Sequence, residues 1–129
     1  MAEITDFLQL MIKHDASDLF FSPGSPLHMK IDGALSVINE KILSGKGVAA
    51  LAHSIMSDEQ RLAFAKRPEM NLGLSVEGQG RFRVNIFRQR GDVAMVIRYL
   101  HDIIPSVAEL NLPPILEKLV MKPRGLILA

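Results

Sequence analysis

Residues 80–100 read GRFRVNIFRQRGDVAMVIRYL and decide the fold of this 129-residue chain. Two runs rich in Val, Ile and Phe flank the polar residues 89–92, which is the pattern of a β-hairpin. A symmetric turn, with a loop of two or four residues, places Val84 opposite Ile97. Because side chains alternate between the two faces of a strand, one face of this hairpin is apolar and is expected to face the core. That face carries Phe82, Val84, Ile86, Met95, Ile97 and Tyr99.

The other face of the hairpin carries two arginines, and the same register places Arg83 directly opposite Arg98. Like charges directly opposite across strands are destabilising, so the pair requires an anion, a carboxylate or a partner chain. A phosphate group can bridge two guanidinium groups through bidentate hydrogen bonds. The alternative is that each arginine pairs with a nearby surface carboxylate, such as Glu77 or Asp92.

The composition limits the class of protein. Hydrophobic residues make up 48% of the chain and the formal net charge is +1, which indicates a folded domain without a general basic surface. The chain has no cysteine, which excludes disulfides and thiolate metal sites. No apolar run approaches the roughly 20 residues that span a bilayer, and the N-terminus does not have the pattern of a signal peptide. We therefore expect a soluble, cytoplasmic protein without direct membrane insertion.

The segments before the hairpin predict an α+β domain with one antiparallel sheet. Apolar periodicity predicts amphipathic helices, and Ser57 with Gln60 forms a capping box for a third, short helix that stops before Pro68. The Asp32-Gly33 pair predicts a tight hairpin turn, whereas residues 44–47 are expected to be loop. The helices are expected at 4–12, 48–56 and from 57, and the strands at 19–21, 27–31, 35–37 and 71–76.

The character of the chain changes after Leu100. Residues 101–105 are interpreted as a connector, and Ser106 with Glu109 forms another capping box. Pro113-Pro114 should break or restart the helix that follows. The fully apolar run at 126–129 predicts a strand buried on both faces, as in parallel α/β sheets.

The sequence shows no recognisable catalytic or metal-binding arrangement. Its four histidines lack metal-ligand spacing, and residues 44–47 (SGKG) lack the spacing of a Walker A motif. The arginines and aromatic residues of 80–90 leave open a single-stranded nucleic-acid surface. The match to the RNP1 pattern is poor, however, and Phe82 is expected on the core face.

Three stretches of this sequence resemble the type IV pilus retraction ATPases, the twitching-motility PilT/PilU family of the secretion-ATPase superfamily. They are residues 16–35 (ASDLFFSPGSPLHMKIDGAL), residues 80–100 and residues 103–129 (IIPSVAELNLPPILEKLVMKPRGLILA). The resemblance implies a PAS-like N-terminal domain over 1–101. Over 102–129 it implies a linker and the first helix and strand of a RecA-like ATPase domain, truncated before Walker A. Phe20 replaces a histidine and Asn71 an acid of the better-known motors, which favours the PilU branch.

The resemblance also implies a function. The family forms ring hexamers that hydrolyse ATP, with Mg bound mainly by the C-terminal domain, and that retract pili at the cytoplasmic side of the inner membrane. Expected partners are other copies of the chain, a paralogous pilus motor and the inner-membrane pilus platform, with no nucleic acid. By motif position, Arg83 and Arg98 match arginines that close over the ATP phosphates, and the Leu112-Pro113 segment resembles the adenine side.

The resemblance also sets expectations for this 129-residue chain on its own. Without a P-loop, this chain is expected to be inactive alone, with its arginine pair solvated or bound to a stray anion. The resemblance assigns no role to Arg81, Arg88 or Arg90. A free-standing PAS-like ligand-sensing module is the main alternative, and a single-stranded nucleic-acid-binding module is a further one.

Overall fold

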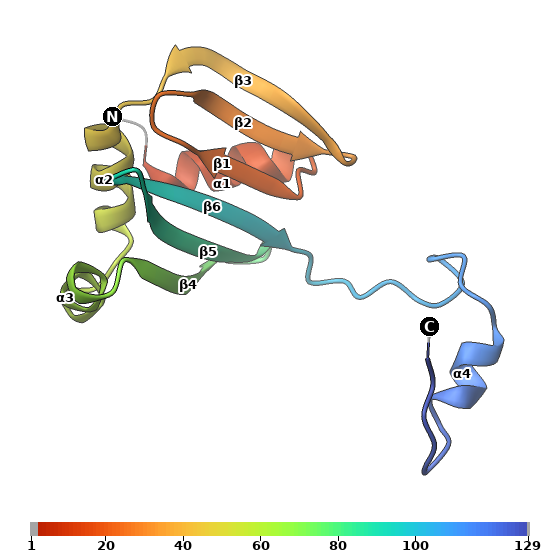
Figure 1. The fold of residues 1–129 in the computed structure, drawn as a ribbon. Helices are drawn as coiled ribbons and strands as arrows, with labels where there is room; N and C mark the ends of the chain where they lie inside the picture. The colour runs from red at the N-terminus through yellow and green to blue at the C-terminus, as the bar shows by residue number, and fades with distance from the viewer. Residues whose placement is uncertain (1–2, 129) are drawn as a thin grey trace.

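The computed structural model describes residues 3–128, and it has the α+β architecture expected from the sequence (Figure 1). Six strands form one antiparallel sheet in the order β3-β2-β1-β6-β5-β4. The order of elements along the chain is also as expected. It is α1 (Ile4–Lys13), β1 (Asp18–Phe21), β2 (Pro26–Ile31), β3 (Ala34–Ile42), α2 (Gly45–Ser54), α3 (Asp58–Lys66), β4 (Glu69–Val76), β5 (Gly80–Gln89), β6 (Asp92–Leu100) and α4 (Ile115–Leu119).

The β5–β6 hairpin has the predicted register. Arg90 and Gly91 form its two-residue loop, and both have positive φ angles, of 52° and 87°. Such angles at both positions are those of the tight turn whose twist matches the flanking strands. Val84 is the partner of Ile97, and Arg83 is the partner of Arg98, as predicted.

The hydrophobic core lies on one face of the sheet, under α1 and α2. The ring of Phe7 in α1 meets the ring of Phe21 in β1 edge-on, with centroids 5.0 Å apart, and α2 contributes Val48 and Leu51 to the same cluster. The predicted core face of the hairpin is confirmed: five of its residues are 0–1% exposed, and Tyr99 packs against them. Those five are Phe82, Val84, Ile86, Met95 and Ile97.

Local capping sets where α2 and α3 begin. The prediction of a loop over 44–47 was wrong, because α2 already begins at Gly45. The Ser44 hydroxyl accepts a hydrogen bond from the Gly47 N–H at 3.0 Å, and this N-cap offsets the low helix propensity of two glycines. In α3 the predicted capping box is confirmed, with both reciprocal bonds between Ser57 and Gln60 present.

After Leu100 the chain leaves the sheet as an extended segment (Figure 1). Both bonds of the predicted capping box are present: the Ser106 N–H donates to Oε2 of Glu109 at 2.7 Å, and the Glu109 N–H donates to the Ser106 hydroxyl oxygen at 3.2 Å. The hydrogen bond from the Ser106 N–H, and after it the one from the Ser106 hydroxyl, lowers the pKa of the Glu109 carboxyl. The cap nevertheless closes a turn over 107–111 instead of a helix. The helix restarts after Pro113-Pro114 as α4, as expected.

The strand expected at 126–129 does not form over 126–128, the part of this run that the structure describes. Leu126 and Leu128 are 82% and 85% exposed. A strand needs a neighbour for its N–H and C=O groups, and within residues 3–128 no strand pairs with this segment.

Candidate functional site

A row of charged residues crosses the face of the sheet opposite the core. Asp18 is the register partner of Lys30 on one side and of Arg98 on the other. Arg98 is in turn the partner of Arg83, whose other neighbour is Gly73. Since directly opposed residues of neighbouring strands share a face, the order β2-β1-β6-β5 builds a line of charge: cation, anion, cation, cation.

Arg98 has a protein carboxylate as its partner. Its Nε lies 2.9 Å from Oδ1 of Asp18, and the Asp18 side chain is 8% exposed while that of Arg98 is 66% exposed. Most of the Arg98 side chain is nevertheless exposed to solvent. Arg98 therefore pairs with a carboxylate, as the alternative interpretation of the sequence holds, but this carboxylate is Asp18 and neither Glu77 nor Asp92. The reason is the strand order, which brings β1 next to β6.

Arg83 has the environment that the sequence predicts. It is exposed, and within residues 3–128 it forms no ion pair. A hollow of about 320 Å³ lies beside the pair, within the range of small-ligand pockets. Its wall is polar on one side, where Nδ2 of Asn85 donates to Oδ1 of Asn71 at 3.1 Å. The lining residues are Asp18, Asn71, Arg83, Asn85, Val96 and Arg98.

This hollow is suited to an oxyanion with several acceptor atoms. Two guanidinium groups offer planar forks of N–H donors, which match a phosphate. A second hollow, of about 530 Å³, adjoins the first and shares Asn71 and Arg83 with it. Gly73 of β4 is the next residue in this row, as the register partner of Arg83. Because glycine has no side chain, the second hollow lies open beside Arg83 on the β4 side.

The remaining arginines of the hairpin have separate surroundings. Arg81 lies 3.7 Å from Asp102 of the connector, in an exposed pair. The Arg88 guanidinium lies over the Phe64 ring, 5.5 Å from its centroid, and Arg90 is in the turn. None of the three lines the 320 Å³ hollow. Phe82 is 1% exposed, so it is not available to stack on a nucleic-acid base.

Leu112 and Pro113, the candidates for the adenine side, lie on the connector before α4. Leu112 is 43% exposed and Pro113 is also exposed. Neither residue lines the hollow at the arginine pair. The structure of residues 3–128 therefore does not bring these two positions together with Arg83 and Arg98.

Phe20 and Asn71, from which the sequence resemblance inferred the PilU branch, both lie on the face of the sheet opposite the core, here called the open face. Phe20 is half-buried, with Val96 and His28 as its register partners.

Among residues 3–128, no cluster of three or more His, Asp or Glu side chains has the geometry to hold a metal ion. In this part of the chain no helix is long and apolar enough to cross a bilayer.

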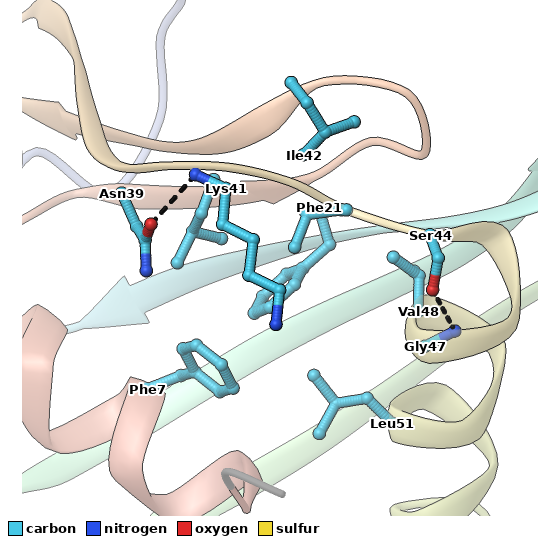
Figure 2. Close-up of a pocket in the computed structure, with 11 residues that line it drawn as sticks. Phe7, Phe21, Asn39, Lys41, Ile42, Ser44, Gly47, Val48 and Leu51 are labelled. Carbon is cyan, nitrogen blue, oxygen red and sulfur yellow. Dashed lines mark hydrogen bonds between the residues drawn. The ribbon is translucent and has the colours of Figure 1, made fainter.

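A different cavity, of about 370 Å³, opens on the core side between α1, the end of β3 and the start of α2. Its walls are mainly apolar, with Phe7, Phe21 and Leu51 among them. Figure 2 shows the Lys41 side chain reaching into it, with its amino group between Phe7 and Leu51. This cavity was not predicted from the sequence, because its lining residues come from segments that only the tertiary fold brings together.

Solved structures with the same fold define the class of protein. The crystal structure of the pilus retraction motor PilT with bound ADP matches 95% of this chain and 36% of its own, with 30% identity and a TM-score of 0.77. The Legionella pneumophila ATPase DotB matches 88% of this chain and 33% of its own, with 22% identity and a TM-score of 0.65. The sheet and helices of this chain therefore have the fold of the matched third of an ATPase of the PilT type.

Sequence comparison narrows the class to a family. The type IV pilus ATPase PilU of Pseudomonas aeruginosa is 39% identical over 126 residues, which are 98% of this chain and 33% of PilU. The retraction ATPase PilT of the same organism is 36% identical over 98% of this chain and 37% of PilT. No established family profile matches the chain.

The chain belongs to the type IV pilus ATPases, as their N-terminal region, and it spans about a third of the length of these relatives. The higher of the two identities is to PilU, which agrees with the branch inferred from Phe20 and Asn71.

Proposed function

We propose that this chain is the N-terminal domain of a hexameric ATPase that powers type IV pilus retraction, and that Arg83 and Arg98 contact the phosphates of ATP. The observation that carries the proposal is the juxtaposition of these two arginines beside a polar hollow on the open face of the sheet. ATP and Mg would be held mainly by a C-terminal domain, which would close over this face.

The electrostatics of the pair favour such closure. Two guanidinium groups opposed on β5 and β6 repel each other, and a phosphate between them replaces repulsion with charge-assisted hydrogen bonds. Because the arginines would belong to a different rigid body from the nucleotide, they would reach the phosphate only when the domains approach. Nucleotide binding would thereby be coupled to domain motion, as for an arginine finger.

The proposal includes a domain boundary and a cellular setting. Residues 1–101 would form the PAS-like N-terminal domain, and 102–129 would form the linker and the start of a RecA-like domain that continues into a P-loop. The hexamer would act at the cytoplasmic face of the bacterial inner membrane, beside a paralogous motor and the pilus platform. Leu112 and Pro113 would approach the adenine after domain closure. A GxxxxGK[ST] motif encoded beyond Ala129 is the first check.

Substitution of the two arginines tests the proposal in the full-length protein. Arg83→Ala or Arg98→Ala is expected to lower the kcat/KM of ATP hydrolysis by about 10²–10³-fold, as for removal of a positioned donor to transition-state charge. Pilus retraction should fail in both variants. Arg90→Ala, in the exposed turn of the same hairpin, is the matched control and should keep wild-type turnover. Wild-type turnover in both Arg83→Ala and Arg98→Ala would show that the proposal is wrong.

The 370 Å³ cavity favours a second candidate function, a ligand-sensing module. Its apolar walls and its lysine suit a small amphipathic carboxylate, with the tail against Phe7 and Phe21 and the acid at Lys41. If this is correct, octanoate should raise the melting temperature of the chain, because a ligand that binds only the folded state stabilises it. Lys41→Met should weaken octanoate binding about two- to fivefold, the effect of losing one exposed charge interaction. An unchanged melting temperature at millimolar octanoate would exclude this function.

A further inference from the structure

We propose that Asp18 is a positioning residue for the phosphate site: it holds Arg98 by its Nε edge and leaves the two terminal nitrogens of the guanidinium to face the phosphate. The inference rests on the proposed function and deepens it, because it assigns different parts to the two arginines. Asp18 itself would not touch the nucleotide.

The atoms in contact support this division. The 2.9 Å contact joins Oδ1 of Asp18 to Nε of Arg98. A guanidinium has five N–H bonds, and a bond through Nε leaves the four on Nη1 and Nη2 unused. Within residues 3–128 no hydrogen bond or ion pair of Arg98 involves Nη1 or Nη2. With 66% of its side chain exposed, Arg98 has room to present them to a ligand.

The carboxylate is itself held firmly, so that it can act as a fixed support. The Ser17 hydroxyl donates to Oδ2 of Asp18 at 2.9 Å, which occupies the oxygen that Arg98 does not use. The backbone of Ser17 is hydrogen-bonded to both neighbouring strands. Its N–H donates to the Lys30 carbonyl, and its carbonyl accepts from the Tyr99 N–H. Asp18 is 5% exposed and lies in β1, between β2 and β6.

The consequence for binding is an asymmetric pair. A flexible arginine loses side-chain entropy when it grips a phosphate, and an arginine that is already held loses less. Asp18 also offsets the charge of Arg98, which reduces the repulsion of Arg83 without occupying Arg83. Arg98 would be the oriented donor and Arg83 the mobile cation that completes the site.

A double-mutant cycle in the full-length protein tests whether Asp18 acts through Arg98. Asp18→Ala is expected to lower the kcat/KM for ATP about tenfold, the effect of a misplaced catalytic group. In the Arg98→Ala background the same substitution should cause no further loss, since the residue that it positions is absent. Asp18→Asn should lose less than Asp18→Ala, because the amide oxygen still accepts from Nε. Asp58→Ala removes the carboxylate of an exposed ion pair with Arg61 on α3. It is the matched control, with turnover close to wild type.

Each outcome of the cycle has a distinct meaning. If the effects of Asp18→Ala and Arg98→Ala multiply, Asp18 acts through the fold and the inference is wrong. Wild-type turnover in Asp18→Ala, beside a large loss in Arg98→Ala, also overturns the inference but leaves the proposed function intact. Wild-type turnover in Arg98→Ala overturns the inference, and wild-type turnover in Arg83→Ala as well overturns the proposed function. Where Asp18→Ala does not fold, the cycle is carried out with Asp18→Asn, which preserves side-chain volume.

Discussion

Arg83→Glu is expected to make this domain more stable and the complete ATPase inactive. Arg83 and Arg98 are register partners on β5 and β6, and the substitution converts a like-charge pair into an opposite-charge pair. Directly opposed ion pairs on a sheet contribute roughly 0.2–1 kcal/mol. Since both side chains are exposed, solvent screening keeps the gain away from the upper end of this range, at about 0.5 kcal/mol. The melting temperature of the chain should rise by a few degrees.

The same substitution should lower ATP turnover more than any alanine substitution at the site. It removes one cation from the phosphate hollow, places a carboxylate there, and gives the guanidinium of Arg98 a second internal partner beside Asp18. We expect kcat/KM to fall by more than about 10³-fold, since like charge is added where transition-state charge must be stabilised. A gain in stability together with a loss of activity is the signature of a functional site that is strained by its own charges.

Two measurements separate these effects. Thermal unfolding of the 129-residue chain reports on stability, and steady-state ATP hydrolysis by the full-length protein reports on the site. Arg83→Gln is the matched control, because it removes the repulsion without adding an anion. It should stabilise the domain slightly and retain more ATP turnover than Arg83→Glu. A lower melting temperature for Arg83→Glu would show that the arginine pair is not repulsive in the folded domain.

The hairpin was predictable from sequence because its determinants are local. A two-residue turn fixes the pairing of the strands it joins, and the period of two then fixes which side chains share a face. A shift by one residue would have turned Val84 and Ile97 toward the open face, and both are fully buried. The capping box at Ser57 was predictable for the same reason, since its partners are three residues apart.

The Asp18–Arg98 contact was not predictable from local patterns. Its two residues are 80 positions apart, and they meet only because β1 inserts between β2 and β6. No turn or periodicity specifies that neighbour. The sequence therefore indicated that Arg98 needed an anion but not which one. The apolar run at 126–128 shows a second limit of prediction from sequence. Its composition predicts a strand, but a strand forms only beside another strand, and local composition does not specify that neighbour.

Gly80→Val is expected to destabilise the domain strongly, because Gly80 meets two constraints at once. Its φ angle is +136°, which side chains rarely adopt, and an added Cβ would lie 2.5 Å from Cε2 of Tyr99. The backbone strain costs about 1–3 kcal/mol, and forcing extra carbon into a packed site costs about 1–3 kcal/mol more. We expect a loss of about 4 kcal/mol for valine and somewhat less for alanine.

The ring of Tyr99 has little freedom to move away from the new side chain. It stacks on Phe82 with centroids 4.9 Å apart, and its hydroxyl donates to the Gln79 carbonyl at 2.6 Å. Moving the ring would break that hydrogen bond and disturb a core residue. Steric conflict at Gly80 should therefore be transmitted to the end of β6, where Tyr99 follows Arg98.

Gly78 provides the matched control, because it also has a positive φ angle, of +69°, but has no atom within 4 Å of an added Cβ. Gly78→Ala should cost only the backbone strain, about 1 kcal/mol. Chemical denaturation of the chain measures the free energy of unfolding of both variants. Adding Tyr99→Ala to Gly80→Val should recover part of the lost stability, because it removes the ring that meets the new side chain. Equal losses at Gly78 and Gly80 would show that backbone conformation alone accounts for the effect. A larger loss at Gly80, partly recovered with Tyr99→Ala, would show that the clash with the Tyr99 ring accounts for the additional cost.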